Sequence, residues 1–346
     1  MKQVQKLTAL TLAVLMCLAV LTACGKNSGA ASGSGSSSAP GSASAETFTP
    51  ADYRVAALKG PTAMGLVKLM SDSDSGTATK NKYSFNIAAS ADEITPALIQ
   101  GDLDIACVPA NLASVLYNKT KGGVQVLAVN TLGVLYIVEN GNAVQSVADL
   151  KGKTIVAAGK GSTPEYALRY LLQKNGINPD TDVTIDWKSE HSECVSALAS
   201  GAATIALLPQ PFVTVAQAKI SNLRVALDLT KEWDALHSGS ALLTGVVVAR
   251  TDVVKENPAA IDAFLQEYAA SVQWVNANVA DAAKLVGGYD IVDAAVAEKA
   301  IPNCNIVCIT GSEMKEKLSG YLSVLNDQNP QSVGGTLPND DFYYGA

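Results

Sequence analysis

The sequence has few basic residues and little histidine. Lys and Arg number 25 against 32 Asp and Glu, two residues are His, and aromatic residues make up 5% of the 346-residue chain. Lys and Arg form no cluster or stripe, which argues against nucleic acid as a partner, because nucleic-acid binding depends on concentrated positive charge. A content of 48% hydrophobic and 16% charged residues is typical of a well-buried soluble α/β protein.

Several enzyme signatures are also missing. The sequence contains neither a Gly-x-Ser-x-Gly elbow nor a His-Glu-x-x-His zinc motif. Residues 159–163 partly match a phosphate-binding loop. However, Gly161 follows Lys160 where a hydroxyl residue is needed, and Thr154 stands where the loop needs glycine. We therefore expect a binding protein without a cofactor. The missing motifs weaken the case for an enzyme without disproving it.

Cysteine is scarce, with six residues. The pair Cys304 and Cys308 lacks Cys-x-x-Cys spacing and has no nearby His, so we expect no metal site there. The pair could close a small disulfide loop outside the cytoplasm or remain two free thiols, and the spacing leaves both open. Cys107 and Cys194 fall in apolar segments and are most simply small core residues.

An apolar run, Leu7–Val20, follows Lys2 and Lys6 and precedes Cys24. It is shorter than the roughly 20 residues that a transmembrane helix needs, although such a helix is the alternative. The segment resembles a bacterial lipoprotein signal peptide cleaved before Cys24. That resemblance implies export, palmitate-type lipidation of Cys24, and an anchor on the outer face of the cell membrane, since two acyl chains anchor stably.

A Ser-, Gly- and Ala-rich stretch follows the lipidation site. Such a composition cannot repay the entropy of ordering, so we expect a flexible tether with a reach of about 25 to 30 Å. The expected divisions are a signal peptide (1–23), the lipidated Cys24 with the tether (24–49), a discontinuous first lobe (50–133 plus 246–346) and a second lobe (134–245).

A repeat at a spacing of 100 residues organises the body. Residues 97–109 and 197–209 share six identities in thirteen positions, and each reads as a helix end, Gly, a short apolar strand and Pro. Gly60 and Gly161 each follow an apolar strand and open a helix. The repeat predicts two similar α/β lobes with a cleft between them; the alternative is that this pattern is common to any α/β protein.

Strands and helices alternate in both halves. The expected strands are 53–58, 83–88, 103–108, 154–158, 183–187, 204–208 and 223–229, and the expected helices are 60–70, 92–100, 111–118, 164–174, 192–200 and 212–218. Strands 124–129 and 134–139 form the first crossing between lobes, and 242–249 the return. The rest, with 258–279 as the longest helix, is expected to be mainly helical and to pack on the first lobe.

Together with the lipoprotein start, three segments carry a family resemblance. They are 54–65, Gly-Asp-Leu-Asp-Ile-Ala at 101–106, and Gly-Lys-Gly-Ser-Thr-Pro-Glu at 159–165. The chain resembles substrate-binding lipoproteins of ABC importers, in the branch of nitrate, sulfonate, taurine and thiamine-precursor binders. This implies a type II periplasmic-binding-protein fold, with two Rossmann-like lobes on a two-segment hinge that hold a small molecule and pass it to a permease. We expect a monomer.

The ligand is expected where strand ends and helix starts meet, since open α/β sheets bind ligands there. Free N–H groups at helix N-termini suit a carboxylate, sulfonate or phosphate-like group. The candidate residues are Gly60, Pro61, Thr62, Ala63, Met64, Ser90, Asp92, Pro109, Asn111, Gly161, Ser162, Thr163, Glu190, His191, Pro209, Gln210 and Thr244.

Structural roles compete with ligand binding at these positions. Ser162 or Thr163 can cap a helix, Asn111 and Gln210 can be surface turn residues, and for His191 we favour a helix cap. Aromatic residues are sparse at the turns, so we favour an anionic organic ligand over a heteroaromatic vitamin precursor. A membrane-tethered sensor is the alternative function, and an enzyme on the same fold is less favoured.

Overall fold

The computed structural model describes residues 48–346 except 78 and 237–238. The expected signal peptide, Cys24, the tether up to residue 47 and the second histidine, His237, lie outside the described residues. The described part of the chain belongs to one compact unit. None of its helices is long and apolar enough to cross a membrane.

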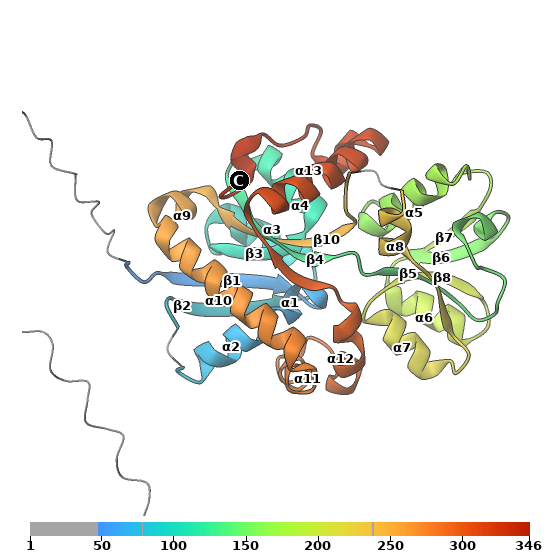
Figure 1. Ribbon diagram of the computed structural model, residues 1–346, viewed down its shortest axis with the longest axis horizontal. Coiled ribbons are helices and arrows are strands. Elements are labelled where there is room, and N and C mark those ends of the chain that lie inside the picture. Colours follow the sequence, from blue (N-terminus) through green and yellow to red (C-terminus); the bar gives the residue numbers. More distant parts are fainter. Residues whose placement is uncertain (1–47, 78, 237–238) are drawn as a thin grey trace, which may run out of the picture. The chain divides into compact units, whose positions relative to one another are not determined.

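Two β-sheets with helices around them make up this unit (Figure 1). The first sheet has the order β11-β4-β10-β3-β1-β2, with β1 Asp52–Leu58, β2 Lys82–Ala88, β3 Ile105–Pro109, β4 Val124–Leu132, β10 Leu243–Arg250 and β11 Ile306–Ile309. The second has the order β7-β6-β8-β5-β9, with β5 Leu135–Glu139, β6 Thr154–Ala158, β7 Thr184–Lys188, β8 Ile205–Pro209 and β9 Arg224–Asp228. This confirms the predicted α/β class with two sheets.

Helices follow the strands in both halves. Those of the first half are α1 Pro61–Met64, α2 Val67–Asp74, α3 Ala91–Gln100 and α4 Ala110–Thr120. Those after β5 are α5 Thr163–Lys174, α6 His191–Ala199, α7 Phe212–Lys219 and α8 Leu229–Asp234. The last are α9 Thr251–Glu256, α10 Pro258–Ala277, α11 Val279–Gly288, α12 Ala294–Ala300 and α13 Gly311–Gln328, and 3-10 turns lie at Val147–Leu150, Ile301–Asn303, Pro330–Val333 and Asp340–Phe342.

The chain passes from one sheet to the other twice. It leaves the first sheet after Leu132, the end of β4, and enters the second at Leu135 in β5. It returns in β10, which runs antiparallel to β3 and β4 and pairs with β4 from Leu243 onward. Two segments therefore connect the sheets, an arrangement that permits hinge motion about a ligand.

The 100-residue repeat corresponds to the same unit in each sheet. Gly101 ends α3 and Gly201 follows α6, and both adopt a left-handed backbone (φ 87° and 75°) that glycine reaches without steric cost. Of the strands that follow, β3 pairs in parallel with β1, and β8 pairs in parallel with β6.

The two halves share one apolar core on the side of α13. Trp233 of α8 and Tyr321 of α13 are fully buried with ring centroids 6.0 Å apart, and Tyr170 of α5 lies 4.4 Å from Trp233. One continuous cluster of buried side chains includes residues of both sheets. The elements on this side hold the halves together through packed aromatic rings.

Among the elements that differ from the prediction, two depend on packing. The helix expected at 60–70 is broken into α1 and α2, because the backbone at Gly65 passes so close to α10 that an added Cβ would lie 2.8 Å from Tyr268 Oη. Strand β11 was not predicted; only Ile306 and Ile309 pair with β4. Both features depend on contacts between residues far apart in the sequence.

The disulfide considered for Cys304 and Cys308 is not formed, and both are free thiols. Cys304 follows the turn Ile301–Asn303, the chain then turns at Asn305 (φ 45°), and Cys308 lies in extended strand β11. An extended strand advances about 3.3 Å per residue, which carries Cys308 away from Cys304. Burial raises the pKa of the two thiols to about 12 and about 11 respectively.

Candidate functional site

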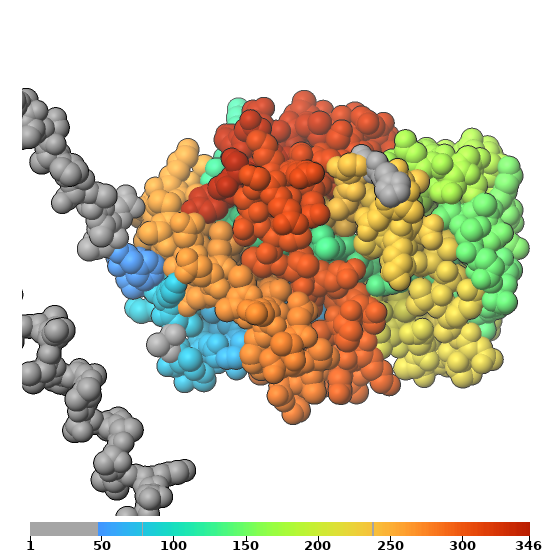
Figure 2. All heavy atoms as spheres, in the orientation of Figure 1, coloured from blue at the N-terminus to red at the C-terminus, as the bar shows by residue number. Residues whose placement is uncertain are grey.

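The predicted turns lie at equivalent strand ends of the two sheets. In the first sheet, strands β1, β2 and β3 end near α1, α3 and α4; in the second, β6, β7 and β8 lead into α5, α6 and α7. In the space-filling view the second half (green to yellow) meets the C-terminal helices (orange to red) along a seam (Figure 2). Helix α12 packs on α7 and α13 packs on α5 across this seam.

Four of the predicted polar side chains are buried at these turns. Thr62, Asn111, Thr163 and Gln210 are 7%, 8%, 6% and 5% exposed. Buried polar atoms are nearly always hydrogen-bonded, so their bonds show which groups remain for a ligand.

Most of the hydrogen-bonding groups in the turn before α1 bond to other atoms of the same turn. Gly60 has φ 119°, and its carbonyl accepts from the N–H groups of Ala63 (3.1 Å) and Met64 (3.2 Å). Thr62 Oγ1 donates to the carbonyl of Leu58 at 3.0 Å, and the Ala63 and Met64 side chains lie in the core. Pro61 has no N–H, so this turn has one backbone donor fewer than a turn without proline.

Three other turns are occupied by carboxylates of this chain. Each carboxylate lies three or four residues after the N–H that it accepts: Ser90 N to Glu93 Oε1 (3.0 Å), Gly161 N to Glu165 Oε2 (2.7 Å) and Ser189 N to Glu193 Oε2 (3.1 Å). The N–H of Gly161 is therefore engaged with Glu165, and ligand contact at this turn stays a prediction. Ser90 and Asp92 are exposed at the first of these turns.

Ser162 and Thr163 do not cap α5 with their side chains. Ser162 Oγ donates to the carbonyl of Gly159 at 2.7 Å. Thr163 Oγ1 accepts from Tyr321 Oη at 2.9 Å, which joins α5 to α13. Thr163 thus takes part in the contact between the two halves.

The turns before α4 and α7 are the counterparts in the repeat. Asn111 Nδ2 donates to the carbonyl of Ser332 (3.3 Å), and its Oδ1 is buried with no hydrogen-bond partner among the described residues. Gln210 Oε1 accepts from Thr214 Oγ1 (2.9 Å), which leaves its Nε2 group as a donor. Pro109 and Pro209 are the half-buried last residues of β3 and β8.

His191 is the first residue of α6 and not its cap, because the N-cap residue is the exposed Glu190. Its ring lies 5.2 Å from the ring of Phe212, the first residue of α7. Nδ1 of His191 is buried and has no partner within residues 48–346 as far as they are described. Burial lowers the pKa of the imidazole to about 4, so the ring is neutral at pH 7.

A buried polar cluster under α1 was missed in the sequence. Asn130, at the end of β4, and Tyr268 of α10 are fully buried, and the Nδ2 and Oη atoms lack hydrogen-bond partners in the described part of the chain. Thr244 of β10, which is one of the predicted ligand residues, is half-buried, and its Oγ1 is a buried atom that also lacks a partner among the described residues. At Gly245 an added Cβ would lie 2.5 Å from Asn130 Oδ1. A polar residue amid a β-branched run, as at Asn130, is the signal that could have revealed the cluster.

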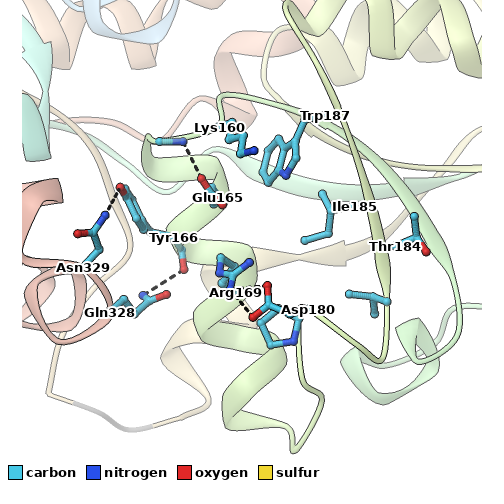
Figure 3. A pocket seen from close by; sticks show the side chains of 13 residues that line it. Lys160, Glu165, Tyr166, Arg169, Asp180, Thr184, Ile185, Trp187, Gln328 and Asn329 are labelled. Carbon is cyan, nitrogen blue, oxygen red and sulfur yellow. Dashed lines mark hydrogen bonds and ion pairs between the residues drawn. The ribbon is translucent and has the colours of Figure 1, made fainter.

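A cavity of about 940 Å³ lies beside the α5 turn (Figure 3). Its lining includes Lys160, Glu165 and Trp187, with Gln328 and Asn329 from the end of α13. Of the predicted ligand residues only Gly161 lines it. The cavity is lined mainly by residues of α5 and of β7, the edge strand of the second sheet, and none of its lining residues belongs to the predicted turns of the first sheet.

Residues 76–297 match the family of periplasmic substrate-binding proteins of phosphonate ABC transporters. The chain belongs to that family. This confirms the resemblance seen in the sequence, and the family makes the chain an exported substrate-binding protein of an ABC transporter. A binding protein of Brucella abortus (strain 2308) is 25% identical over 236 residues, which cover 67% of this chain and 70% of that protein.

Solved structures share the fold. An ABC transporter protein of Parabacteroides distasonis has a TM-score of 0.71 at 23% identity and covers 84% of this chain and 98% of its own. The periplasmic aliphatic sulphonate-binding protein of Escherichia coli has a TM-score of 0.66 at 18% identity, covering 83% and 96%. At such identities the likeness shows the periplasmic-binding-protein fold alone.

Proposed function

We propose that this chain is a lipid-anchored extracytoplasmic protein that captures a small molecule between its two lobes and delivers it to an ABC importer permease. The observation that carries the proposal is the pair of sheets joined by two segments, with buried polar atoms of Asn111, His191 and Thr244 that have no hydrogen-bond partner among the described residues. Such groups cost free energy in the absence of a partner, which a bound ligand would supply. The proposed lobes are 50–133 plus 246–346 and 134–245.

The proposed ligand is a small anionic organic molecule. Its anionic group would bind at the turns before α4 and α7, because no carboxylate accepts a backbone N–H there among the described residues, whereas Glu93, Glu165 and Glu193 do so at the turns before α3, α5 and α6. The function proposed is binding rather than catalysis, and the protein acts as a monomer.

Anchoring is tested on the full chain expressed in a bacterium. If Cys24 is lipidated, the wild-type protein should be found in the membrane fraction and should become labelled when cells are grown with labelled palmitate. Cys24→Ala should release the protein from the membrane fraction and abolish the label. A matched control is Cys194→Ala, a buried thiol on α6, which should leave both readouts unchanged. Label that persists in Cys24→Ala contradicts the anchor.

Delivery is tested in cells that depend on import of the ligand. Deletion of the protein should abolish uptake at low ligand concentration, and restored uptake should require the wild-type chain. If deletion leaves uptake unaffected but abolishes a transcriptional response to the ligand, the result favours the membrane-tethered sensor.

A further inference from the structure

We propose that a basic groove at the outer edge of the first sheet binds the anionic headgroups of the membrane to which the protein is anchored. The inference rests on the proposed lipid anchor and goes beyond ligand capture. The groove has a volume of about 680 Å³ and is lined by the ends of α3, α4 and α9. None of the residues predicted to bind the ligand lines it.

The groove lies at the edge of the first sheet that is remote from the second sheet. Strands β3 and β4 begin at this edge and β10 ends there, because Ala249 pairs with Ile105 and Arg250 pairs with Val124. The segments that cross to the second sheet join the opposite ends of β4 and β10. A surface bound at this edge would therefore not compete with a ligand held between the sheets.

The lining of the groove carries an excess of positive charge. Lys119, Lys121 and Lys255 are exposed and form no ion pair with a carboxylate among the described residues. The fourth cation, Arg250, bonds Asp252, which is the one acidic residue of the lining. The groove thus holds three uncompensated positive charges in a chain whose formal net charge is −7. Such a local field attracts anionic groups to this part of the surface.

Lys121 occupies a backbone conformation that favours glycine. It is the C-cap residue of α4, with φ 56°, and Gly122 and Gly123 follow it. A side chain in the left-handed region brings Cβ close to a carbonyl oxygen, so glycine would be the more stable residue there. Thr251 fixes the loop, because its N–H donates to the carbonyl of Gly123 (3.0 Å) and its hydroxyl to that of Gly122 (2.6 Å). The chain therefore places a lysine where the fold itself favours glycine.

Exposed apolar side chains and the course of the chain favour a lipid surface over a free anion. Ile99 in the lining and Phe48 are 42% and 43% exposed, two of the four large apolar side chains exposed in the described part of the chain. Phe48 precedes Thr49, whose carbonyl accepts from Asn257 Nδ2 at 2.9 Å, and Asn257 directly follows α9. The start of β1 and helix α9 lie at the same end of the molecule (Figure 1). Basic and apolar side chains beside an acyl anchor are the combination that binds anionic membranes.

The helix dipole is the competing explanation for these lysines. Lys119 and Lys255 lie in the last turns of α4 and α9, where the dipole favours a cation. The chain offers a matched control in exposed lysines of the last turns of α5, α7 and α12 that form no ion pair with a carboxylate among the described residues, namely Lys174, Lys219 and Lys299. The two sets share charge and helix position, but only the first set lines the groove.

The test uses the chain from residue 25 onward, which keeps the whole compact unit and carries no lipid. Cosedimentation is measured at physiological salt with vesicles of phosphatidylcholine, alone or mixed with phosphatidylglycerol. We expect wild type to bind the anionic vesicles at least about tenfold more tightly than the neutral ones. Replacement of Lys119, Lys121 and Lys255 by Gln should abolish this preference. The variant in which the control lysines are replaced by Gln should keep the preference to within about twofold.

Lys121→Gly separates membrane binding from the stability of the fold. It should weaken binding to anionic vesicles about fivefold, while the midpoint of urea unfolding does not fall, because glycine adopts a φ of 56° without steric cost. A lysine that serves only to stabilise the end of α4 would give the opposite result, with unchanged binding and a lower midpoint.

Three results would overturn the inference. The first is equal binding of wild type to the two kinds of vesicle, and the second is an equal loss of binding in the groove variant and the control variant. The third is release of the protein from anionic vesicles by inorganic phosphate at constant ionic strength, which would assign the groove to a free anion. Failure of the proposed anchor has a separate signature, because it appears as missing palmitate label in the full chain and leaves vesicle binding of the lipid-free chain unchanged.

Discussion

Tyr321 Oη donates a 2.9 Å hydrogen bond to Thr163 Oγ1, and both side chains are buried. Tyr321 lies on α13, packed on the first sheet, and Thr163 is the first residue of α5 in the second half. The bond therefore joins a helix of each half within the shared aromatic core.

Removal of this bond should destabilise the protein. Tyr321→Phe leaves Thr163 Oγ1 buried without its donor, so we expect the free energy of unfolding in urea to fall by about 1 to 2 kcal/mol. Tyr344→Phe is the control, because Tyr344 Oη bonds Asp262 in an exposed position and its loss should cost less than about 0.5 kcal/mol. Equal losses in the two variants would contradict the role given to the bond.

Glu139 should make stability depend on acid. Burial by itself raises the pKa of this carboxylate, but the N–H groups of Ala143 (2.8 Å) and Val144 (3.1 Å) and the Arg224 guanidinium outweigh burial and lower the pKa. A lowered folded-state pKa stabilises the protein above the unfolded-state value, and that stability is lost as pH falls through the folded-state pKa.

The corresponding variant is Glu139→Gln. It should lower stability at pH 7 by about 3 kcal/mol, since it leaves a partly buried Arg224 without its partner, and should flatten the loss of stability below pH about 4. Urea unfolding at a series of pH values measures both effects. The role given to Glu139 would be contradicted if the variant were as stable as wild type, or if its stability fell with acid in the same way.

His191 should contribute a second, higher pH dependence. Its folded-state pKa of about 4 is below the ordinary histidine value of about 6.5, so the stability that it contributes is present above pH about 6.5 and is lost as pH falls toward about 4. We expect a loss of about 2 kcal/mol across this window in wild type and a smaller one in His191→Phe. An NMR titration of the imidazole is the direct measurement; a midpoint near 6.5 would contradict the burial argument.

Gly245 should tolerate no side chain. Its Cβ would lie 2.5 Å from Asn130 Oδ1 and 2.6 Å from Thr62 Cγ2, so Gly245→Ala should cost about 1 to 3 kcal/mol in urea unfolding. Gly288→Ala is the matched control, because open space surrounds that position and alanine favours the helix. A neutral Gly245→Ala would mean that β4 and α1 shift easily to make room.

The local sequence pattern predicted most of the fold. Apolar runs placed the strands to within a few residues, and the glycines of the repeat marked two equivalent helix ends, Gly101 and Gly201. The sequence pattern failed to predict features that depend on contacts between residues far apart in the sequence. The break at Gly65 depends on Tyr268, some 200 residues later, and β11 exists because two isoleucines meet β4.

The site was less predictable than the fold. Turn positions followed from strand ends, but the hydrogen bonds at each turn did not. Glu165 stands four residues after Gly161, and an acid at that spacing was the available signal that the N–H was occupied. The pairing of Arg224 with Glu139, 85 residues apart, has no local signature. The charged groups that remain unpaired and could contact a ligand could therefore be identified only from the three-dimensional structure.

The most direct test of the central claim is thermal unfolding of the chain from residue 25 onward against small amides, amines, alcohols and acids, repeated with Asn111→Ala. A ligand at 100 times its dissociation constant should stabilise wild type by about 2.7 kcal/mol, and Asn111→Ala should lose most of that stabilisation. A ligand that stabilises both proteins equally, or a panel in which none stabilises wild type, would contradict capture at the turns between the two sheets.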